Sequence, residues 1–464
     1  MAKIKVEWDK WDWNKGKISY TTNITYLIRS YSFQKSIKSP EGSGELTLSP
    51  RLTRDNTGLY KNLLDLMEDR DVIRIYEYDV LKFVGYIDTV GLSGWLDQSG
   101  KPTRVCKVPL KFMGNILAES SVGLGMGRII GNETATVAAA HQLQVAIADA
   151  MLDGLSYAEL ITVVVDNWKS LLEEVGSKVY LTYLDTYFDF SVAVSTENRP
   201  ILPKRLTLYD GTETSINLWS ILMSLVEPPF NELWIDCGPR KVRVAGKNID
   251  LPDKKVAIVF RDTPFDGTVN PSNGVIENKF SDLPAVDLAN KYLTRYDLSR
   301  SGKEAVSVFG VVPAAFDFEQ TTLELLGTII VSDLNLSKYQ YKTLIQQLFY
   351  IRTESPDSPD VDISSAKYND VLLNMSNTLK NWFEHNSKMV SGTLQMVVPP
   401  KNPDPVIGTR LSPELTPDGF FYVEAIVHQF TYPTALTSTL TVTRGYGKTA
   451  PISFNHGAFN GGRA

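Results

Sequence analysis

The chain has 464 residues, of which 43% are hydrophobic and 22% are charged, and its formal net charge is −6. This composition is typical of a globular protein, and the length exceeds one ordinary core, so we expect about two to four domains. The acidic balance argues against nucleic-acid binding as the main function.

The cysteine content and the hydropathy pattern indicate where the chain folds. Cys106 and Cys237 lie far apart in the sequence, which provides no disulfide framework and favours a reducing compartment. The first residues, MAKIKVEWDKWDW, lack the apolar core of a signal peptide. No run reaches the ~18 apolar residues of a membrane helix. We therefore expect synthesis in a cytoplasm and no membrane insertion.

Residues 1–115 are predicted to form an N-terminal β-barrel domain. The segments GSGELTLSP (42–50) and DVIRIYEYDVLKFVGYIDTVGLSG (71–94) alternate as half-buried strands do. Between them, LYKNLLDLME (59–68) predicts a short helix.

Three tryptophans, Trp8, Trp11 and Trp13, precede these strands at a spacing that is not helical. They either pack on the first barrel or form a surface cluster that anchors a partner, and we favour packing.

Residues 116–200 are predicted to be a helical insertion with connecting strands. Helices are expected around 132–176, where Ser156 and Glu159 form a capping box and Gly176 follows the last turn. The next run, KVYLTYLDTYFDFSVAV, is rich in aromatic and β-branched residues and predicts strands.

Residues 201–330 are predicted to be a middle α+β domain. A helix that ends before Pro228 is expected first. The segments 230–237 and 240–244 are expected to pair as a hairpin over a Gly-Pro turn, and 256–265 is expected to add a strand.

Residues 331–390 are predicted to be a helical segment with two helices. Apolar residues recur at intervals of three and four over 341–349 and again over 371–383. The polar run SPDSPD (355–360) separates the two helices.

Residues 391–447 are predicted to form a C-terminal β-barrel domain, followed by a polar tail at 448–464. Four alternating or β-branched runs are separated by Pro, Asp, Gly and Ser, which is typical of a closed antiparallel meander. The pattern is similar to that of residues 42–94. The predicted class is therefore α+β, with two small antiparallel β-barrels bracketing an α/β middle unit with helical insertions.

Alternation leaves one face of each barrel for the core and the other for a partner. In the last barrel it places Tyr422 and Ile426 on one face and Val423 on the other, without saying which face is inside. The candidate interface residues are Val84, Tyr86, Tyr422, Val423, Ile426 and Arg444.

The sequence contains no recognisable catalytic, cofactor-binding or metal-binding pattern, so we expect a protein that is not an enzyme and needs no cofactor. Its histidines, His141, His385, His428 and His456, lack metal-ligand spacing. The run GLGMG at 123–127 and the run GKT at 447–449 lack the other glycines of nucleotide-binding loops.

Arg240, Lys241 and Arg243 form the clearest basic cluster. A phosphate contact and salt pairing both fit this cluster, and we favour salt pairing.

The order of these segments resembles the central hub proteins of contractile phage baseplates, the late control protein D-like tail hub family, which tail-like injection machines also carry. The resemblance rests on SGELTLSP…DRDVIRIYEYDVLKFVGYIDTV, PPFNELWIDCG…VFRDTPF and PVIGTRL…FFYVEAIVHQFTYPTALTSTLTVTRG. It covers most of the chain except the helices predicted at 132–176 and 337–388.

The resemblance implies a structural, trimeric adaptor in the tail baseplate of a virion, assembled in the cytoplasm of a bacterial host. Three protomers with two similar barrels each present six, which would join a sixfold tail tube to a threefold central spike. The implied partners are the tail tube protein, the central spike protein and baseplate wedge proteins. Three copies carry 3 × (−6) = −18 charges, and an acidic lumen would let DNA pass without specific binding.

Two other functions stay open. One is a receptor-binding or tail-fibre protein, although repetitive or lectin-like C-terminal sequence is absent. The other is a cell-wall hydrolase of the tail tip, whose carboxylates would be brought together only in space.

Overall fold

The computed structural model shows an α+β protein, which confirms the predicted class. The structure describes residues 3–37, 39, 42–49, 52–54, 60–96, 102–122, 157–174, 176–193, 216–224, 226, 229–238, 240–244, 247–264, 268–269, 276–278, 283–313, 329–348, 366–398, 405–416, 419–434 and 436–447. No helix within these ranges is both long and apolar enough to cross a membrane. The predicted helical insertion before residue 157 and the polar tail at 448–464 lie outside them.

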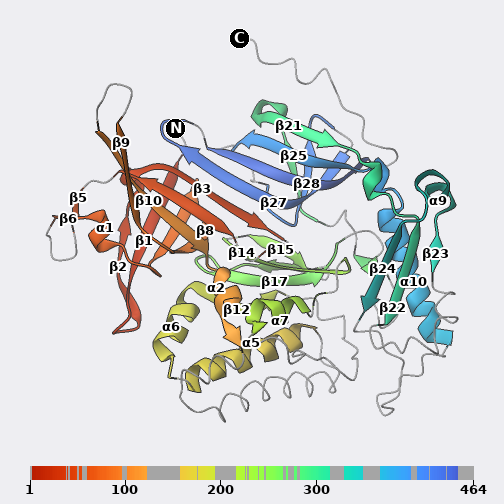
Figure 1. Cartoon of the computed structure of the whole chain (residues 1–464), viewed down its shortest axis with the longest axis horizontal. Coiled ribbons are helices and arrows are strands. Elements are labelled where there is room, and N and C mark those ends of the chain that lie inside the picture. The colour runs from red at the N-terminus through yellow and green to blue at the C-terminus, as the bar shows by residue number, and fades with distance from the viewer. Residues whose placement is uncertain are drawn as a thin grey trace.

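Fourteen strands form one large, mostly antiparallel sheet that contains both ends of the described chain (Figure 1). Its main path runs β2-β1-β7-β8-β10-β4-β3-β27-β28-β25-β21, with β9 beside β10, and β26 between β27 and β20. The strands of the N-terminal unit are β1 (Ile4–Asp12), β2 (Lys17–Asn23), β3 (Ile28–Ser36), β4 (Ser43–Leu48), β7 (Val72–Glu77), β8 (Val80–Ile87), β9 (Gly91–Leu96) and β10 (Pro102–Phe112). The strands of the C-terminal unit are β20 (Ala285–Leu288), β21 (Leu293–Ser299), β25 (Val390–Val397), β26 (Arg410–Pro413), β27 (Gly419–Thr431) and β28 (Thr437–Gly447).

The two units are joined by β3 and β27, which pair antiparallel from Ser36 opposite Ala425 to Ser30 opposite Thr431. The prediction of two separate closed barrels is therefore wrong for the described residues, whose sheet contains no closed barrel. A strand at the edge of either unit would carry unpaired backbone groups, and the pairing of β3 with β27 satisfies them. The alternating runs at both ends are strands, as predicted, but they belong to one sheet.

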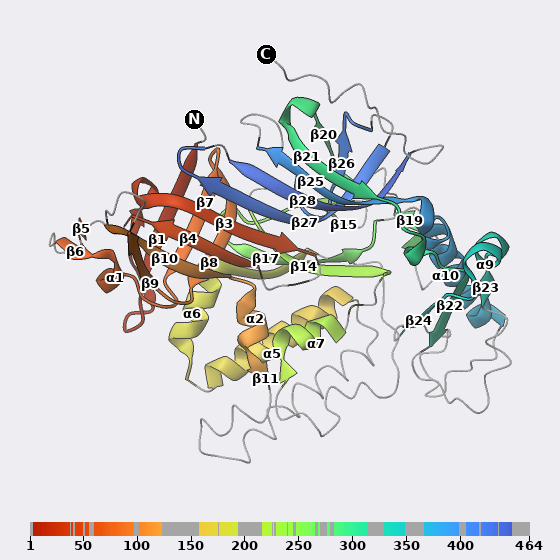
Figure 2. The ribbon, with the colours of Figure 1, turned by 45° about the horizontal axis from the view of Figure 1, so that its top comes forward.

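A three-stranded sheet forms a second layer beneath the large one (Figure 2). Its central strand, β17 (Val256–Asp262), is antiparallel to β14 (Asn231–Cys237) and parallel to β12 (Phe188–Ala193). Every residue of β14 and β17 is buried, as expected for strands covered on both faces. The predicted hairpin is wrong, because β14 pairs with β17 while β15 (Lys241–Val244) pairs with β16 (Lys247–Asp250).

Helices cover the other face of this second sheet (Figure 2). They are α2 (Asn115–Glu119), α5 (Tyr157–Glu174), α6 (Lys178–Tyr187) and α7 (Leu218–Ser224). Helix α5 and the turn at Gly176 confirm the helix predicted there, with Val164 and Trp168 on its buried face. The strands predicted from residue 178 are wrong up to Tyr187, because α6 buries Tyr183 and Tyr187 one helical turn apart and β12 begins only afterwards.

The short helix predicted at 59–68 is confirmed only over Leu63–Leu66, because Tyr60–Asn62 form a strand that pairs with Leu52–Arg54. The smaller described elements complete the inventory. They are β5 (Leu52–Arg54), β6 (Tyr60–Asn62), α1 (Leu63–Leu66), β11 (Ser121–Val122), β13 (Ile216–Asn217), β18 (Thr268–Val269) and β19 (Ile276–Asn278).

The N-terminal tryptophans mainly pack inside the fold, as favoured from the sequence. Trp8 and Trp11 on β1 are buried, whereas Trp13 is 38% exposed. The ring of Trp11 meets Tyr183 and Tyr187 of α6 edge to face, with centroids 5.2 and 6.0 Å apart. Such pairs contribute about 0.5–1.5 kcal/mol each beyond their buried area, so they attach α6 to the N-terminal unit.

A further unit lies at the right of Figure 1 and contains β22 (Val308–Pro313), β23 (Ile330–Val331), β24 (Thr343–Leu348), α9 (Asp333–Tyr339) and α10 (Ala366–Phe383). Helix α10 confirms the second helix predicted between 331 and 390. It packs on β22, and its residues Leu372 and Leu379 are buried. The first predicted helix is wrong, because the segment from Thr343 to Leu348 is a strand parallel to β22. Over six residues, apolar spacing alone cannot separate a helix turn from a strand that finds a partner.

Gly238, at the end of β14, lies directly against Leu81 of β8 in the N-terminal unit. We expect Gly238→Ala to lower the melting temperature more than Gly176→Ala does. Gly238 has φ +103°, and a Cβ there would lie 2.3 Å from the carbonyl oxygen of Leu81. Gly176 has φ +79° but open space around its Cβ, so its substitution adds only left-handed strain of about 1–2 kcal/mol. If both variants lowered the melting temperature in thermal unfolding by the same amount, the close approach of Gly238 to Leu81 would be unimportant for stability.

Candidate functional site at the junction of the terminal units

The pairing of β3 with β27 collects aromatic side chains from both ends of the chain in one buried row. Tyr31 stacks on Phe430 with centroids 5.5 Å apart, and Phe33 stacks on the ring of His428 at 4.7 Å. Phe33 also contacts Phe83 of β8 at 5.0 Å. Cross-strand aromatic pairs stabilise sheets, so this junction has the packing of a core.

Glu77 of β7 places a fully buried carboxylate against this row. Its Oε2 lies 3.0 Å from Nδ1 of His428, and its Oε1 accepts a 2.8 Å hydrogen bond from the hydroxyl of Tyr31. Burial alone would raise the pKa of Glu77, but His428, Lys82 and Tyr31 outweigh it and hold this pKa below its usual value. The carboxylate thus links β7 to both strands of the junction.

Folding lowers the pKa of Glu77 below the ordinary carboxyl value of 4.5. The ionised carboxylate therefore contributes fully to stability above pH 4.5, and this contribution is lost as the pH falls through the pKa of the folded state. We expect the free energy of unfolding of the wild type to fall more steeply below pH 4.5 than that of Glu77→Gln. Urea titrations from about pH 7 to about pH 3 measure both slopes. Glu45→Gln, at an exposed position of β4, should keep the wild-type slope.

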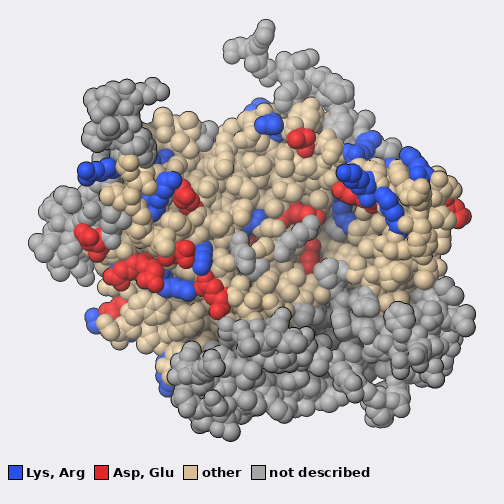
Figure 3. All heavy atoms as spheres, viewed as in Figure 1, with Lys and Arg blue, Asp and Glu red and all other residues tan. Residues whose placement is uncertain are grey.

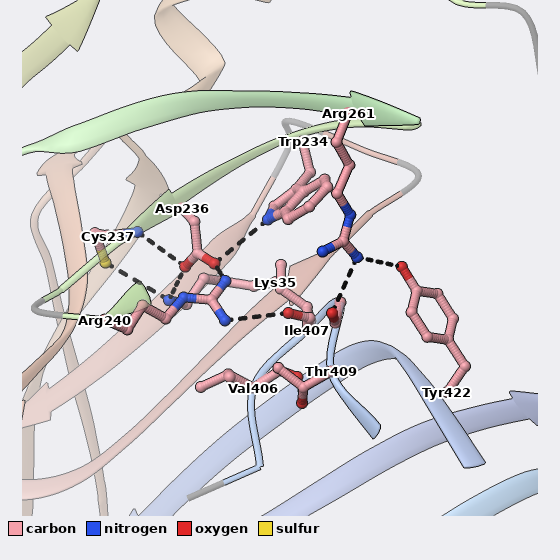
Figure 4. A network of polar contacts seen from close by, with 11 residues as sticks. Lys35, Trp234, Asp236, Cys237, Arg240, Arg261, Val406, Ile407, Thr409 and Tyr422 are labelled. Atoms are coloured by element: carbon pink, nitrogen blue, oxygen red, sulfur yellow. Dashed lines mark hydrogen bonds and ion pairs between the residues drawn. The ribbon is translucent and has the colours of Figure 1, made fainter. Parts of the chain in front are cut away.

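A second buried network joins the three-stranded sheet to the C-terminal unit (Figure 4). Arg261 of β17 is 1% exposed, and its Nε lies 2.5 Å from Oε1 of Glu232 on β14. Its Nη2 donates to the hydroxyl of Tyr422 and to the carbonyl oxygen of Gly408, both at 2.9 Å. The guanidinium also lies 4.8 Å from the ring centroid of Trp234. Although burial opposes it, the negative charge of Glu232 keeps the pKa of Arg261 above its usual value.

Beside this network, two cationic side chains contact the carboxylate of Asp236 on β14 (Figure 4). Lys35 of β3 donates to its Oδ1 at 3.0 Å, and Arg240 forms an ion pair with its Oδ2. Arg240 also donates through Nη1 to the carbonyl oxygen of Ile407 at 3.1 Å. Salt pairing, the interpretation favoured for the basic cluster, is confirmed for Arg240, and Asp236 connects the second sheet to both terminal units.

The structure places five of the six predicted interface residues inside the chain, each at most 3% exposed: Val84, Tyr86, Tyr422, Val423 and Ile426. The first two lie on β8 and the other three on β27. Tyr422 belongs to the Arg261 network, and Ile426 faces Lys35 across the junction. Tyr422 therefore contacts the second sheet, whereas Ile426 lies at the junction of β3 and β27, and a role of either in contacting another protein stays a prediction.

Arg444 of β28, the sixth residue, is half-buried next to Thr443, which pairs with Tyr422, and it packs against α10. Its guanidinium lies 4.7 Å from the ring centroid of Phe383 and donates to the carbonyl oxygen of Trp382 at 3.3 Å. It therefore attaches the large sheet to the unit of β22 and α10.

Sequence reasoning missed Lys35, Glu232, Asp236 and Arg261 as members of the site. A usable signal was present, because three of these charges interrupt the apolar runs NELWIDC and VAIVFRD. A charged side chain in a strand buried on both faces requires a partner, so each one predicts a contact with another layer.

The described part of the chain contains no group of three or more His, Cys, Asp or Glu side chains placed to hold a metal ion. Surface charges are unevenly spread on the face drawn in Figure 3. Basic side chains gather over the unit of β22 and α10, whereas acidic and basic side chains are interspersed on the N-terminal unit.

Solved structures provide the decisive comparison. The 43 kDa tail protein of prophage MuSo2 from Shewanella oneidensis aligns over 97% of this chain and 100% of its own, with a TM-score of 0.50 and 11% identity. This chain has the fold of a phage tail protein. No protein-family model matches the chain, and comparison with curated proteins gives no match in sequence.

Two further structures align over most of this tail-protein fold. The tail protein of Neisseria meningitidis MC58 covers 96% of both chains, with a TM-score of 0.49 and 10% identity. The c3393 protein of E. coli, a type VI secretion component described as similar to the T4 phage tail proteins gp27 and gp5, covers 92% of this chain and 75% of its own. Its TM-score is 0.36 and its identity 7%.

Proposed function

We propose that this chain is a structural hub of a phage tail baseplate or of a tail-like contractile injection machine. It forms a trimer that joins the sixfold tail tube to the threefold central spike. The observation that carries this proposal is the lateral pairing of β3 with β27 in a chain with a phage tail-protein fold. Each protomer then contributes two β-rich units side by side, and three protomers contribute six.

The buried polar groups support a structural role. Glu77 joins β7 to β27 of the large sheet through His428. Glu232 and Arg261 of the second sheet both bind the hydroxyl of Tyr422 on the large sheet, and Asp236 binds Lys35 there. A buried charge that loses its partner is costly, so these pairs favour one arrangement of the strands, which suits a structural role.

The partners proposed with this function are the tail tube protein, the central spike protein and baseplate wedge proteins. DNA would pass through the lumen without specific binding, and the protein would be part of the virion after assembly in the bacterial cytoplasm. A receptor-binding or tail-fibre role is the alternative in a tail, and it would place the chain at the periphery.

The mass of the purified protein in solution, with and without its spike, tests the trimer. We expect light scattering to give about three times 51.8 kDa, at least when the spike is present. A stable monomer in the presence of the spike would contradict the proposal.

A density map of the intact tail tip tests the position of the chain. The proposal requires this chain on the tail axis between tube and spike, and a position at the periphery would favour the tail-fibre alternative. A zymogram on cell walls separates the hydrolase alternative, since the proposed hub leaves the wall intact.

A further inference from the structure

The unit of β22 and α10 carries half of the large hydrophobic side chains that are exposed in the described part of the chain. There are ten such side chains, and five of them lie within residues 331–345: Val331, Leu334, Leu336, Tyr341 and Ile345. Exposed apolar residues that are scattered singly are normal, whereas their concentration in one short segment marks an interaction site.

Helix α9, in the middle of this segment, has a polar residue on its buried side and leucines on its outer side. Asn335 is 3% exposed, and its Nδ2 donates to the carbonyl oxygens of Val306 at 2.8 Å and Glu384 at 2.7 Å. Leu334 and Leu336 are 60% and 37% exposed. A surface helix that serves only the fold turns its apolar side chains toward the core. The outward leucines therefore indicate a surface that another molecule covers.

Four lysines surround the end of this helix at Tyr339. The Nζ atoms of Lys338 and Lys342 lie 5.0 and 5.9 Å from the ring centroid of Tyr339. Lys342 also donates to the carbonyl oxygen of Lys303 at 3.4 Å, and the turn that contains Lys303 lies beside the turn that contains Lys388. No ion pair links any of these four lysines to a carboxylate within the described ranges.

This surface is positive although the chain as a whole is acidic. Its exposed carboxylates are Glu304 and Asp333, so four lysines less two carboxylates give +2, compared with −6 for the whole chain. Glu384 does not change this sum, because Lys380 is its cation at 4.0 Å. The same surface belongs to the unit over which basic side chains gather in Figure 3. Its charge complements an acidic partner.

We propose that the α9 surface binds an acidic segment of another protein. We define this surface as Leu334, Leu336 and Tyr341 together with the four lysines. Aspartate and glutamate side chains of the bound segment contact the lysines, and its apolar side chains cover the two leucines and the tyrosine. Lys338 lies one helical turn after Leu334, so a segment that covers one also reaches the other. The inference goes beyond the proposed function and does not depend on it, because it needs only one protomer and one partner segment.

A labelled synthetic peptide tests the chemistry of the partner. The probe is a fluorescein-labelled peptide of about ten residues in which Asp and Glu alternate with Leu and Phe. Fluorescence anisotropy should show that the full chain binds it at least about tenfold more tightly than a peptide with Lys in place of Asp and Glu. The difference should shrink in about 0.5 M salt, because salt screens exposed charges. Equal affinities, or no binding of the acidic peptide, would overturn the proposal.

Matched substitutions test the location of the site. Leu334→Ser and Lys338→Ser should each weaken binding of the acidic peptide about threefold or more, and the double variant at least about tenfold. Leu92→Ser and Lys241→Ser are the controls and should bind as the wild type does, since Leu92 is 50% exposed on β9 and Lys241 is exposed on β15. Substitutions at such exposed positions change stability little, and circular dichroism checks that each variant is folded. Binding by the double variant that equals that of the wild type would refute the site.

Two other occupants of the α9 surface give different results. If a second copy of the chain covers it, Leu334→Ser lowers the mass that light scattering measures without peptide. If a lipid surface covers it, the wild type binds vesicles of phosphatidylcholine and phosphatidylglycerol but not the acidic peptide. Either result would overturn the proposal. Peptide binding by a chain that stays monomeric with the spike present would contradict the proposed trimer and support this site, so the two proposals fail separately.

Discussion

Replacing Arg261 by methionine is expected to destabilise the protein by about 3–5 kcal/mol, the usual cost of removing one partner from a buried ion pair. The guanidinium is the counter-charge of Glu232 and also binds Gly408 and Tyr422. Methionine fills similar volume without charge. The loss would therefore come from a buried carboxylate left without its cation, at the contact between the second sheet and the C-terminal unit.

Urea unfolding followed by tryptophan fluorescence measures this loss, because Trp234 lies directly against Arg261. Lys241→Met is the matched control, since Lys241 and Asp250 are 3.9 Å apart and exposed, and such pairs are worth about 0–1 kcal/mol. Adding Glu232→Gln to Arg261→Met should recover part of the loss. If Arg261→Met alone were as stable as the wild type, this network would not hold the layers together.

Replacing Val423 by aspartate is expected to unfold the C-terminal unit, with a loss of about 4 kcal/mol or more. Val423 is completely buried on β27, opposite Val442 of β28. A carboxylate at this position would be desolvated between apolar neighbours. Because β27 also pairs with β3, the damage should extend to the junction with the N-terminal unit.

Limited proteolysis and circular dichroism report this unfolding. Gln429→Asp is the control on the same strand, since Gln429 is exposed and should change stability by no more than about 0.5 kcal/mol. A protease-resistant, fully folded Val423→Asp variant would refute the assignment of this side chain to the core.

The burial of both Val423 and Ile426 depends on a feature that alternation cannot predict. Simple alternation places these two residues on opposite faces. The pairing of β27 with β28 shifts register between Val423 and Ala425, and a bulge of this kind adds a residue that turns the following side chains to the other face. The inward face is therefore continuous along β27, although the sequence pattern along the strand is interrupted.

Elements with a strong local signal were predicted well, and elements that depend on a partner were not. Helices α5 and α10 have apolar residues at helical spacing over 18 residues each, which is long enough to identify them. Helix α6 is predicted as a strand and strand β24 as a helix. Both are short, and their aromatic and aliphatic residues fit the helical and the strand period equally well, so contacts with neighbouring layers decide which one forms.

The sequence by itself determined the α+β class, the positions of most strands at both ends and the presence of charges inside apolar strands, because each of these is a property of neighbouring residues. Tertiary structure alone decided that β3 pairs with β27, that Arg261 meets Glu232 and Tyr422, and that the end strands form one sheet. These contacts join segments far apart in the chain. The packing of whole layers decides which strands pair at their edges and which buried charges form ion pairs. Local sequence periodicity therefore cannot predict these contacts.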